Sequence, residues 1–348
     1  MKSSRFNRRT MLAASLAIGP LQTLTGAEPK RIRLGQIGTR HAHAAGKITS
    51  VRALPDLYDV VGISDSEPSD EKSYEGIPRM STEALLAIPG LEVVNVETAM
   101  EASCSTALKV IEAGKHIHLD KPGALDHAEF RQMRLQAEKR GVIVQMGYML
   151  RHNPAFELLF RAVREGWLGE ITEIDAMMGK LADQSTRESI GKLPGGGMFE
   201  LGCHMIDAVV TLVGKPAAVH SFSTPSAADG VKDNQLAVFE YPKTTVTLRV
   251  NHTDPFGGPR RRFQVSGTKG SMEIMPMESG KGVLRLNAAH EGYAKGDHAI
   301  QIKVPKDRYV GEFTTLAKCI RGEMKFPWNA EHDIAVHETV MKACGEMK

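Results

Sequence analysis

The sequence contains few cysteines, and none of them stands in a paired motif. Its 348 residues include four cysteines, and no C-x-x-C spacing occurs among Cys104, Cys203, Cys319 and Cys344. A chain of this length can bury enough apolar surface to fold without covalent cross-links, which excludes a scaffold that depends on disulfides. We expect the four side chains to be buried free thiols.

Long hydrophobic runs are absent after the first 27 residues. No later segment approaches the roughly 18 apolar residues that a membrane-spanning helix needs. The one apolar run, 11–24, follows the basic pair Arg8-Arg9 and precedes a small-residue end at 25–27. This order predicts a twin-arginine export signal over residues 1–27 and a periplasmic location. An ordinary N-terminal anchor or a disordered basic tail is the alternative.

The rest of the chain also lacks an excess of charge of either sign. Residues 1–27 hold four basic residues and no acidic one, so the formal net charge of +3 becomes −1 without them. This balance leaves no basic stripe for nucleic acid, and we expect no such partner. Low-complexity tracts and solenoid repeats are missing as well, which indicates an ordinary globular chain.

Short apolar runs alternate with amphipathic helical patterns between residues 31 and 150. Continuous apolar strands separated by helices predict a parallel sheet that is covered on both faces, as in a doubly wound Rossmann domain. The expected strands are 31–38, 58–65, 91–98, 115–122 and 141–149, and the expected helices are 44–54, 82–88, 104–114 and 126–140.

The pattern changes in the second part of the chain, residues 151–348. Four or five runs with period-2 alternation predict a mostly antiparallel sheet with one open face, which makes this an α/β substrate or oligomerisation domain. No linker rich in proline or glycine separates the two parts, so we expect them to pack closely. Four of the runs are 234–242, 244–252, 262–270 and 271–277, and helices are expected at 153–167, 312–322 and 330–347, the last a candidate to pack on the Rossmann domain.

The segment 38–47 resembles a phosphate-cradling turn but departs from its usual pattern. A G-x-G-x-x-G turn needs small residues where the backbone approaches a pyrophosphate at a helix N-terminus. Gly38 fits the first glycine, whereas Arg40 and His43 occupy the other two positions. Asp65, at the end of the second expected strand, is placed to bind a ribose 2′-hydroxyl, which favours NAD over NADP. A cap of a helix or turn is its alternative role.

Two further segments carry groups suited to proton transfer. In "HLDKP", Lys121 follows an expected strand, at the edge where parallel sheets bind ligands. In "GGGMFELGCHMID", helical spacing would place Glu200, His204 and Asp207 on one face. A histidine oriented by carboxylates suits general acid–base chemistry near neutral pH. The alternatives are a solvated lysine before a turn proline and a histidine that fills a polar gap between domains.

Histidines with H-x-H spacing raise the question of a metal site. His41 with His43, and His116 with His118, could together bind zinc or copper. However, His41 lies in the expected cofactor turn and His116 lies at one end of a buried strand. We therefore expect no metal site.

The ordered set of motifs resembles the Gfo/Idh/MocA oxidoreductases. The set comprises the glycine turn, Asp65, Asp120-Lys121-Pro122, and G-G-x(5)-G-x-H-x-x-D, which contains His204. The resemblance covers nearly all of residues 31–348. It implies a Rossmann domain, an open-faced α/β domain, and hydride transfer between NAD(P) and a sugar, glycoside or cyclitol. It also implies Lys121 and His204 as catalytic residues, and a dimer or tetramer formed through the open sheet.

The sequence departs from the family pattern at several positions. Arg40 replaces the second turn glycine, and Ala99 and Ser103 stand where the family has proline and histidine. Asp120 shortens a usual glutamate, and Glu200 lengthens a usual aspartate. Because the two expected catalytic residues are intact, we keep the redox interpretation.

We therefore expect an NAD-dependent oxidoreductase that acts on a secondary hydroxyl of a sugar or glycoside. His204 would take the hydroxyl proton with help from Lys121, Glu200 would orient the histidine, and Tyr148 and Arg151 would line the substrate pocket. The expected cofactor contacts are Gly38, Thr39, Arg40, His41, Asp65, Glu97, Thr98, Asp120 and Lys121.

The expected export bears on the mechanism, because the periplasm supplies no free NAD pool. The cofactor has to travel inside the folded protein, and either a second substrate or return of the hydride has to reset it. The second hypothesis is therefore a redox-assisted glycosidase that oxidises, eliminates and re-reduces. A non-catalytic sugar- or nucleotide-binding relative is the rival from another class.

Overall fold

The computed structural model describes residues 30–64 and 71–347. The expected export signal and Asp65 both lie outside the described residues. Within the described ranges, no helix combines the length and the apolar character that crossing a membrane requires. From Arg31 onward the chain forms one unit with two sheets, and this unit is described below.

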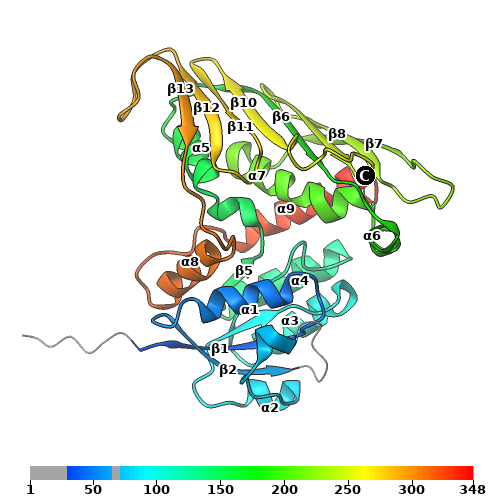
Figure 1. Ribbon diagram of the computed structural model, residues 1–348, viewed down its shortest axis with the longest axis vertical. Coiled ribbons are helices and arrows are strands. Elements are labelled where there is room, and N and C mark those ends of the chain that lie inside the picture. Colours follow the sequence, from blue (N-terminus) through cyan, green and yellow to red (C-terminus); the bar gives the residue numbers. More distant parts are fainter. Residues whose placement is uncertain (1–29, 65–70, 348) are drawn as a thin grey trace, which may run out of the picture. The chain divides into compact units, whose positions relative to one another are not determined.

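The first sheet has five parallel strands in the order β2-β1-β3-β4-β5. Figure 1 labels β1, β2 and β5 of this sheet. All four side chains of β3 are buried, as in a parallel sheet with helices on both faces. The strands are β1 (Ile32–Ile37), β2 (Tyr58–Ser64), β3 (Val93–Val96), β4 (His116–Leu119) and β5 (Val144–Met146). The helical segments between them are α1 (Ala44–Arg52), η1 (Glu71–Tyr74), α2 (Thr82–Leu86), α3 (Met100–Glu112) and α4 (His127–Lys139).

Local sequence signals set the ends of these helices. The carboxylate of Asp126 accepts a hydrogen bond from the backbone N–H of Glu129 at 2.9 Å, which caps the start of α4. After the last turn of α4, Gly141 has a φ of +67°, the left-handed conformation that commonly ends a helix. Asn153 and Pro154 begin the next helix, α5 (Pro154–Arg164), in the same way, with an asparagine cap and a proline in the first turn.

The second sheet has eight strands in the order β13-β12-β11-β10-β6-β9-β8-β7. Its neighbours are antiparallel except β6 and β9, which are parallel. The strands are β6 (Ile171–Gly179), β7 (Ala218–Thr224), β8 (Asn234–Glu240), β9 (Thr245–Asn251), β10 (Arg262–Gly267), β11 (Gly270–Ile274), β12 (Lys281–Leu286) and β13 (Gly296–Gln301). In β9, buried Val246, Leu248 and Val250 alternate with more exposed residues, so one face packs on helices and the other is open. The expected α/β fold class is confirmed.

Four strands of this sheet, β6, β7, β12 and β13, were not among the runs named from the sequence. β7 is mostly exposed, and its Phe222 side chain is 58% accessible. β13 buries only Ile300, and β12 buries only Leu284 and Leu286. Period-2 alternation is a signal of burial, so strands near the sheet edges that bury little carry little of it.

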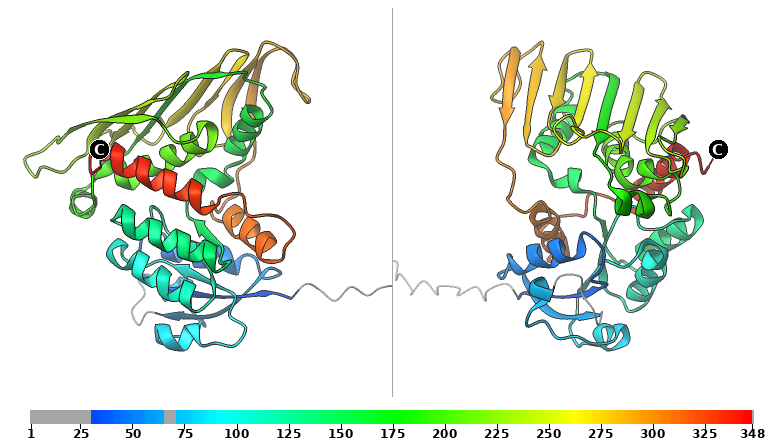
Figure 2. Two further views of the ribbon diagram at one scale, coloured as in Figure 1. Left: turned by 180° about the vertical axis from the view of Figure 1, so that it is seen from behind. Right: turned by 45° about the vertical axis from the view of Figure 1, so that its right-hand side comes forward.

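The remaining helices lie after β5, between β6 and β7, and after β13. The segment after β5 is η2 (Met149–His152), and the connection between β6 and β7 contains α6 (Gln184–Ile190), the π-helical turn η3 (Met198–Gly202) and α7 (Cys203–Val213). After β13, α8 (Val310–Ile320) returns to pack beside α1, where Phe313 and Leu316 join the core on that face of the first sheet. The last helix, α9 (Ala330–Ala343), packs against both α4 and α7 (Figure 2). All four cysteines are buried and free, as predicted.

Candidate active site

Three neighbouring cavities form a trough along the carboxyl ends of the parallel strands. Their volumes are about 730, 550 and 180 Å³. The first and second cavities share Arg40 and Ala99, and the second and third share Lys121 and Glu200. The trough runs from the end of β2 to His204 on α7. Ligands of open α/β sheets bind at this edge.

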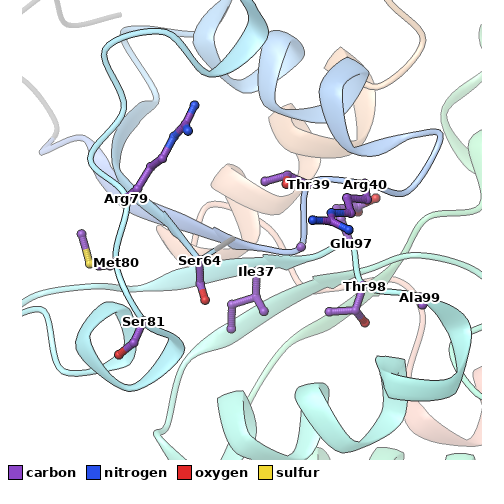
Figure 3. Close-up of a pocket in the computed structure, with 11 residues that line it drawn as sticks. Ile37, Thr39, Arg40, Ser64, Arg79, Met80, Ser81, Glu97, Thr98 and Ala99 are labelled. Atoms are coloured by element: carbon purple, nitrogen blue, oxygen red, sulfur yellow. The ribbon is translucent and has the colours of Figure 1, made fainter. Parts of the chain in front are cut away.

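The turn after β1 lines the first cavity (Figure 3). Gly38 has a φ of +89°, and a Cβ atom there would lie 2.4 Å from the carbonyl oxygen of Glu97. Only glycine therefore fits this position without a shift of the β3 backbone. Thr39 and Arg40 follow in the turn, and Figure 3 labels them among the residues that line this cavity, with Glu97 and Thr98 at the end of β3. The first position of a phosphate turn is thus present, although Arg40 and not glycine stands at the second.

A buried lysine lies between two carboxyl groups behind the turn. Lys47 Nζ is 2.7 Å from Glu97 Oε1 and 2.6 Å from Asp120 Oδ1, and its side chain is fully buried. Burial alone would raise the pKa of Asp120, but the charge of Lys47 holds this pKa well below its ordinary value. Burial raises the pKa of Glu97 to about 8, although Lys47 opposes this shift. One ammonium therefore keeps Asp120 ionised, while Glu97 takes up a proton near neutral pH.

His41 and His43 approach the same aspartate. His43 Nδ1 lies 3.1 Å from Asp120 Oδ1, and His41 Nδ1 lies 3.5 Å from Oδ2. Burial lowers the pKa of His41 to about 4 and also lowers that of His43, so both rings are neutral at pH 7. The ligating atoms of the three residues lie within 4.8 Å of one another, which is a set that metals can use. However, the ammonium of Lys47 is already a cation on this carboxylate.

The other H-x-H pair does not belong to this set. His118 Nε2 is 2.5 Å from Glu312 Oε2 on α8. His116 Nδ1 accepts the backbone N–H of Ile143 at 3.1 Å. The structure therefore does not bring the four histidines together as one ligand set.

Lys121 and His204 line the third cavity, and each is only 5% exposed. Burial lowers the pKa of Lys121, but the acidic groups around it, Cys203, Glu200 and Asp120, outweigh burial and raise it. Burial, with the charge of Lys121, lowers the pKa of His204 well below its ordinary value. At neutral pH the site therefore holds a charged ammonium beside a neutral imidazole. The His204 ring meets Tyr148 edge-on, with centroids 6.1 Å apart.

Glu200 does not make the contact with His204 that was expected from helical spacing. Its backbone carbonyl accepts a hydrogen bond from Lys121 Nζ at 2.7 Å. Its carboxylate lies 3.2 Å from Lys180 Nζ and 3.1 Å from His252 Nε2. The physical reason is the π-helical turn η3, which displaces Glu200 from the face that a regular helix would give it. Glu200 therefore contacts Lys121, through its backbone carbonyl, rather than His204.

The structure also places Arg151 away from the third cavity. Its guanidinium is fully buried and lies 2.6 Å from Asp207 Oδ1 and 2.8 Å from Asp333 Oδ1. Two buried carboxylates therefore hold the group that was expected to contact substrate. Tyr148 packs on this guanidinium at 4.9 Å and is 1% exposed, so it supports the cavity from behind and does not line it.

Two sequence patterns from one oxidoreductase family match this chain. The family's NAD-binding Rossmann domain matches residues 32–148, and its C-terminal domain matches residues 156–273. The chain belongs to the Gfo/Idh/MocA family. The first match contains the turn after β1 and Lys121, and the second contains His204. Both sides of the trough therefore come from domains of the Gfo/Idh/MocA family.

Two of the similar proteins have names that state a substrate, one a cyclic diol and the other an aldose. Trans-1,2-dihydrobenzene-1,2-diol dehydrogenase from Bos taurus is 26% identical over 242 residues, which cover 65% of this chain and 69% of that protein. The aldose-aldose oxidoreductase from Caulobacter crescentus, solved with glycerol, superposes with a TM-score of 0.76 and 22% identity over 91% of this chain and 98% of the other. GenD2 from gentamicin A biosynthesis, solved with NAD, superposes with a TM-score of 0.75 and 20% identity over 92% of this chain and 95% of the other. At these identities the structural likeness shows the Gfo/Idh/MocA fold alone.

Several residues of the trough were missed by sequence reasoning. Lys180, Arg261, Arg308 and Tyr309 line the third cavity, and buried Lys47 lies behind it. Lys180 directly follows β6, a strand end that could have drawn attention. The other positions carry no family signal in this sequence, because they come from loops and from a helix face that the fold brings together.

Proposed function

We propose that this chain is an NAD-dependent oxidoreductase that acts on a secondary hydroxyl of a sugar or glycoside. The observation that carries the proposal is the charged ammonium of Lys121 beside the neutral imidazole of His204 in one cavity. This pair suits removal of a proton from an alcohol. The named relatives support a ring alcohol as the substrate, since one is a dehydrogenase of a cyclic diol and another an aldose-aldose oxidoreductase.

The first two cavities fit a dinucleotide. Gly38 leaves the space that a Cβ atom would fill, and Arg40 lines both cavities. The hydroxyl of Thr98 is buried and has no hydrogen-bond partner among the described residues, so a ligand could satisfy it. The residues assigned to the cofactor are Gly38, Thr39, Arg40, His41, Glu97, Thr98 and Lys121, which line these cavities. Asp120 is assigned with them from the sequence, although it lines neither cavity and its carboxylate lies against Lys47, His41 and His43. Asp65 remains a predicted contact that favours NAD over NADP.

Proton movement at the substrate is assigned to the residues of the third cavity. His204 accepts the hydroxyl proton. Its lowered pKa keeps the imidazole neutral but also makes it a weaker base, so the charge of Lys121 has to lower the pKa of the hydroxyl group. Lys121 donates a hydrogen bond to the same oxygen and stabilises the negative charge that develops there. The backbone carbonyl of Glu200 orients the ammonium of Lys121. When bound, the nicotinamide supplies the acceptor for the hydride, so the alcohol becomes a ketone.

The test is turnover of the purified full chain on a panel of sugars and glycosides, with Lys121→Met and His204→Gln as variants. Loss of a positioned acid or base costs roughly 100- to 10,000-fold, so we expect a fall in kcat of that order in both variants, with unchanged cofactor content in His204→Gln. Lys109→Met, at an exposed position on α3, is the matched control and should behave like the unchanged chain. Turnover of both active-site variants within a few-fold of the control would end the assignment.

We further propose that the protein is exported with NAD already bound. The support is the twin-arginine pattern in residues 1–27 and the position of Arg40, which lines both cavities of the dinucleotide site. As a charge partner for the pyrophosphate, Arg40 would slow release of the cofactor. Mass spectrometry of the ligand released on denaturation should find NAD in the unchanged chain and less of it in Arg40→Gly. Equal retention in both proteins would remove this role from Arg40.

The proposed assembly is a homodimer or homotetramer formed through the open face of the second sheet. Its support is the uncovered sheet surface and the exposed side chain of Phe222 on β7. Light scattering after size-exclusion chromatography should give the mass of two or four chains, and Phe222→Lys should lower it. A mass of one chain for the unchanged protein would contradict this proposal.

A further inference from the structure

The third cavity carries more positive than negative charge. Its lining includes the cations Lys121, Lys180, Arg261 and Arg308, and Glu200 is the one carboxylate among its lining residues. The two histidines of the lining add no charge, since the pKa of each lies below its ordinary value. A neutral sugar would leave this excess of positive charge uncompensated.

Two of the four cations already have carboxylate partners. Lys180 Nζ lies 3.2 Å from Glu200 Oε1, and Arg261 forms an ion pair with Glu278. Lys121 donates to a backbone carbonyl and is assigned to the reacting oxygen. Arg308 is therefore the cation that is left for another part of the substrate.

Arg308 is held in place by neutral groups. Its Nη2 donates to the Tyr309 hydroxyl at 2.6 Å, its guanidinium lies 4.8 Å from the Tyr309 ring centroid, and Nη1 is 3.7 Å from Met149 Sδ. Among the described residues it forms no ion pair with a carboxylate. The adjacent carboxylate of Asp307 instead accepts hydrogen bonds from Ser50 and from the backbone N–H of Tyr309. The guanidinium is thus positioned before a ligand arrives, which lowers the entropic cost of binding an anion.

The position of Arg308 separates it from the expected pyrophosphate. Of the three cavities, Arg308 lines only the third, whereas Arg40 lines the first and the second. Arg308 belongs to the segment between β13 and α8, and the phosphate turn follows β1. An anion that meets Arg308 in this cavity therefore belongs to the substrate.

We propose that the substrate is an anionic sugar, whose carboxylate or phosphate pairs with Arg308 while its reacting hydroxyl lies at Lys121 and His204. This inference rests on the proposed function, and it adds the substrate class. A cavity of about 180 Å³ is small for a ligand site, which limits the bound portion to about one sugar ring. Arginine suits both anions, because its planar guanidinium can donate two parallel hydrogen bonds to either.

Binding is tested by calorimetry on the purified full chain with its resident cofactor. The probes are matched sugars: glucose, glucuronate and glucose 6-phosphate, and the corresponding galactose and mannose sets. We expect one anionic probe to bind roughly tenfold or more tightly than its neutral partner, the gain of one charge-assisted hydrogen-bonded contact. Whether the uronate or the phosphate wins identifies the anion.

Arg308→Gln tests whether this residue causes the preference, and Lys306→Gln is the matched control. Lys306 is exposed, lies two positions away in the same segment and lines none of the three cavities. We expect Arg308→Gln to bring the anionic and neutral probes to equal affinity and Lys306→Gln to keep the difference. Equal affinities in the unchanged chain, no binding of any anionic probe, or a preference that survives in Arg308→Gln would each overturn the proposal.

The kcat/KM of reduction of the resident cofactor separates this inference from the proposed function. Neutral sugars that reduce the cofactor as well as their anionic partners would leave the proposed function standing and remove the anionic substrate. Anionic sugars that bind through Arg308 but never reduce the cofactor would support the anion site and contradict the redox assignment.

Discussion

Replacement of Lys47 with methionine removes the ammonium that lies between Glu97 and Asp120 and keeps most of the side-chain length. Asp120 then lies 3% exposed without its counter-ion. Removal of one partner from a buried pair costs about 3–5 kcal/mol, because the remaining charge is left uncompensated. We expect a loss of that order in the free energy of unfolding, measured by urea titration of the full chain with circular dichroism.

Two further variants connect this loss to the buried pair. Lys109→Met on α3 removes an exposed lysine and should change the free energy of unfolding by less than about 0.5 kcal/mol. Lys47→Met combined with Asp120→Asn should be less destabilised than the sum of the single variants, by about 1–3 kcal/mol, since the uncompensated charge is gone. A Lys47→Met variant as stable as the Lys109→Met control would refute the reasoning.

Three other predictions follow from the same region. The pKa of Glu97 is raised from 4.5 to about 8, so the stability that it contributes is full below pH 4.5 and is lost as pH rises through about 8. Glu97→Gln should reduce the pH dependence of the urea midpoint across this range. A pH profile that is unchanged in this variant would count against the shift. In Gly38→Ala the free energy of unfolding should fall by about 1–2 kcal/mol or more, and most of the cofactor should be lost, because alanine is strained at a φ of +89°. Thermal unfolding and cofactor content would measure the two effects. Normal values of both would contradict the close approach of the backbone at Gly38. Prolonged treatment with EDTA should leave turnover unchanged, whereas a loss restored by Zn²⁺ would make His41, His43 and Asp120 a metal site.

The sequence was a good guide to the parts of the fold that are buried. The strands of the first sheet and the strands β8 to β11 of the second carry apolar runs or period-2 alternation, and these were expected. β7 and β13 bury too little to show such a pattern. The return of α8 to the first sheet also has no local signal, because it depends on a partner, α1, that precedes it by more than 250 residues.

The residues of the site also fall into those that the sequence could reveal and those that it could not. Lys121 and His204 could be found because short motifs carry them, and the structure places both in one cavity. Arg151 was expected there as well, but it lies against Asp333, 182 positions away in the sequence, and no spacing rule reveals such a partner. Lys47 was missed for the same reason, since the carboxyl groups that surround it come from the ends of β3 and β4.

Asp333 on α9 pairs with two arginines that are synthesised much earlier than this helix. Its two carboxylate oxygens lie 2.8 Å from Arg134 on α4 and 2.8 Å from Arg151 on η2. While the chain grows on the ribosome, both arginines emerge long before the helix that neutralises them. The early part of a nascent chain therefore has an uncovered α4 surface, with Arg134 lacking its carboxylate partner and Arg151 paired with Asp207 alone. Native packing becomes complete only when α9 docks, so a chain released before α9 would present this surface to chaperones and proteases.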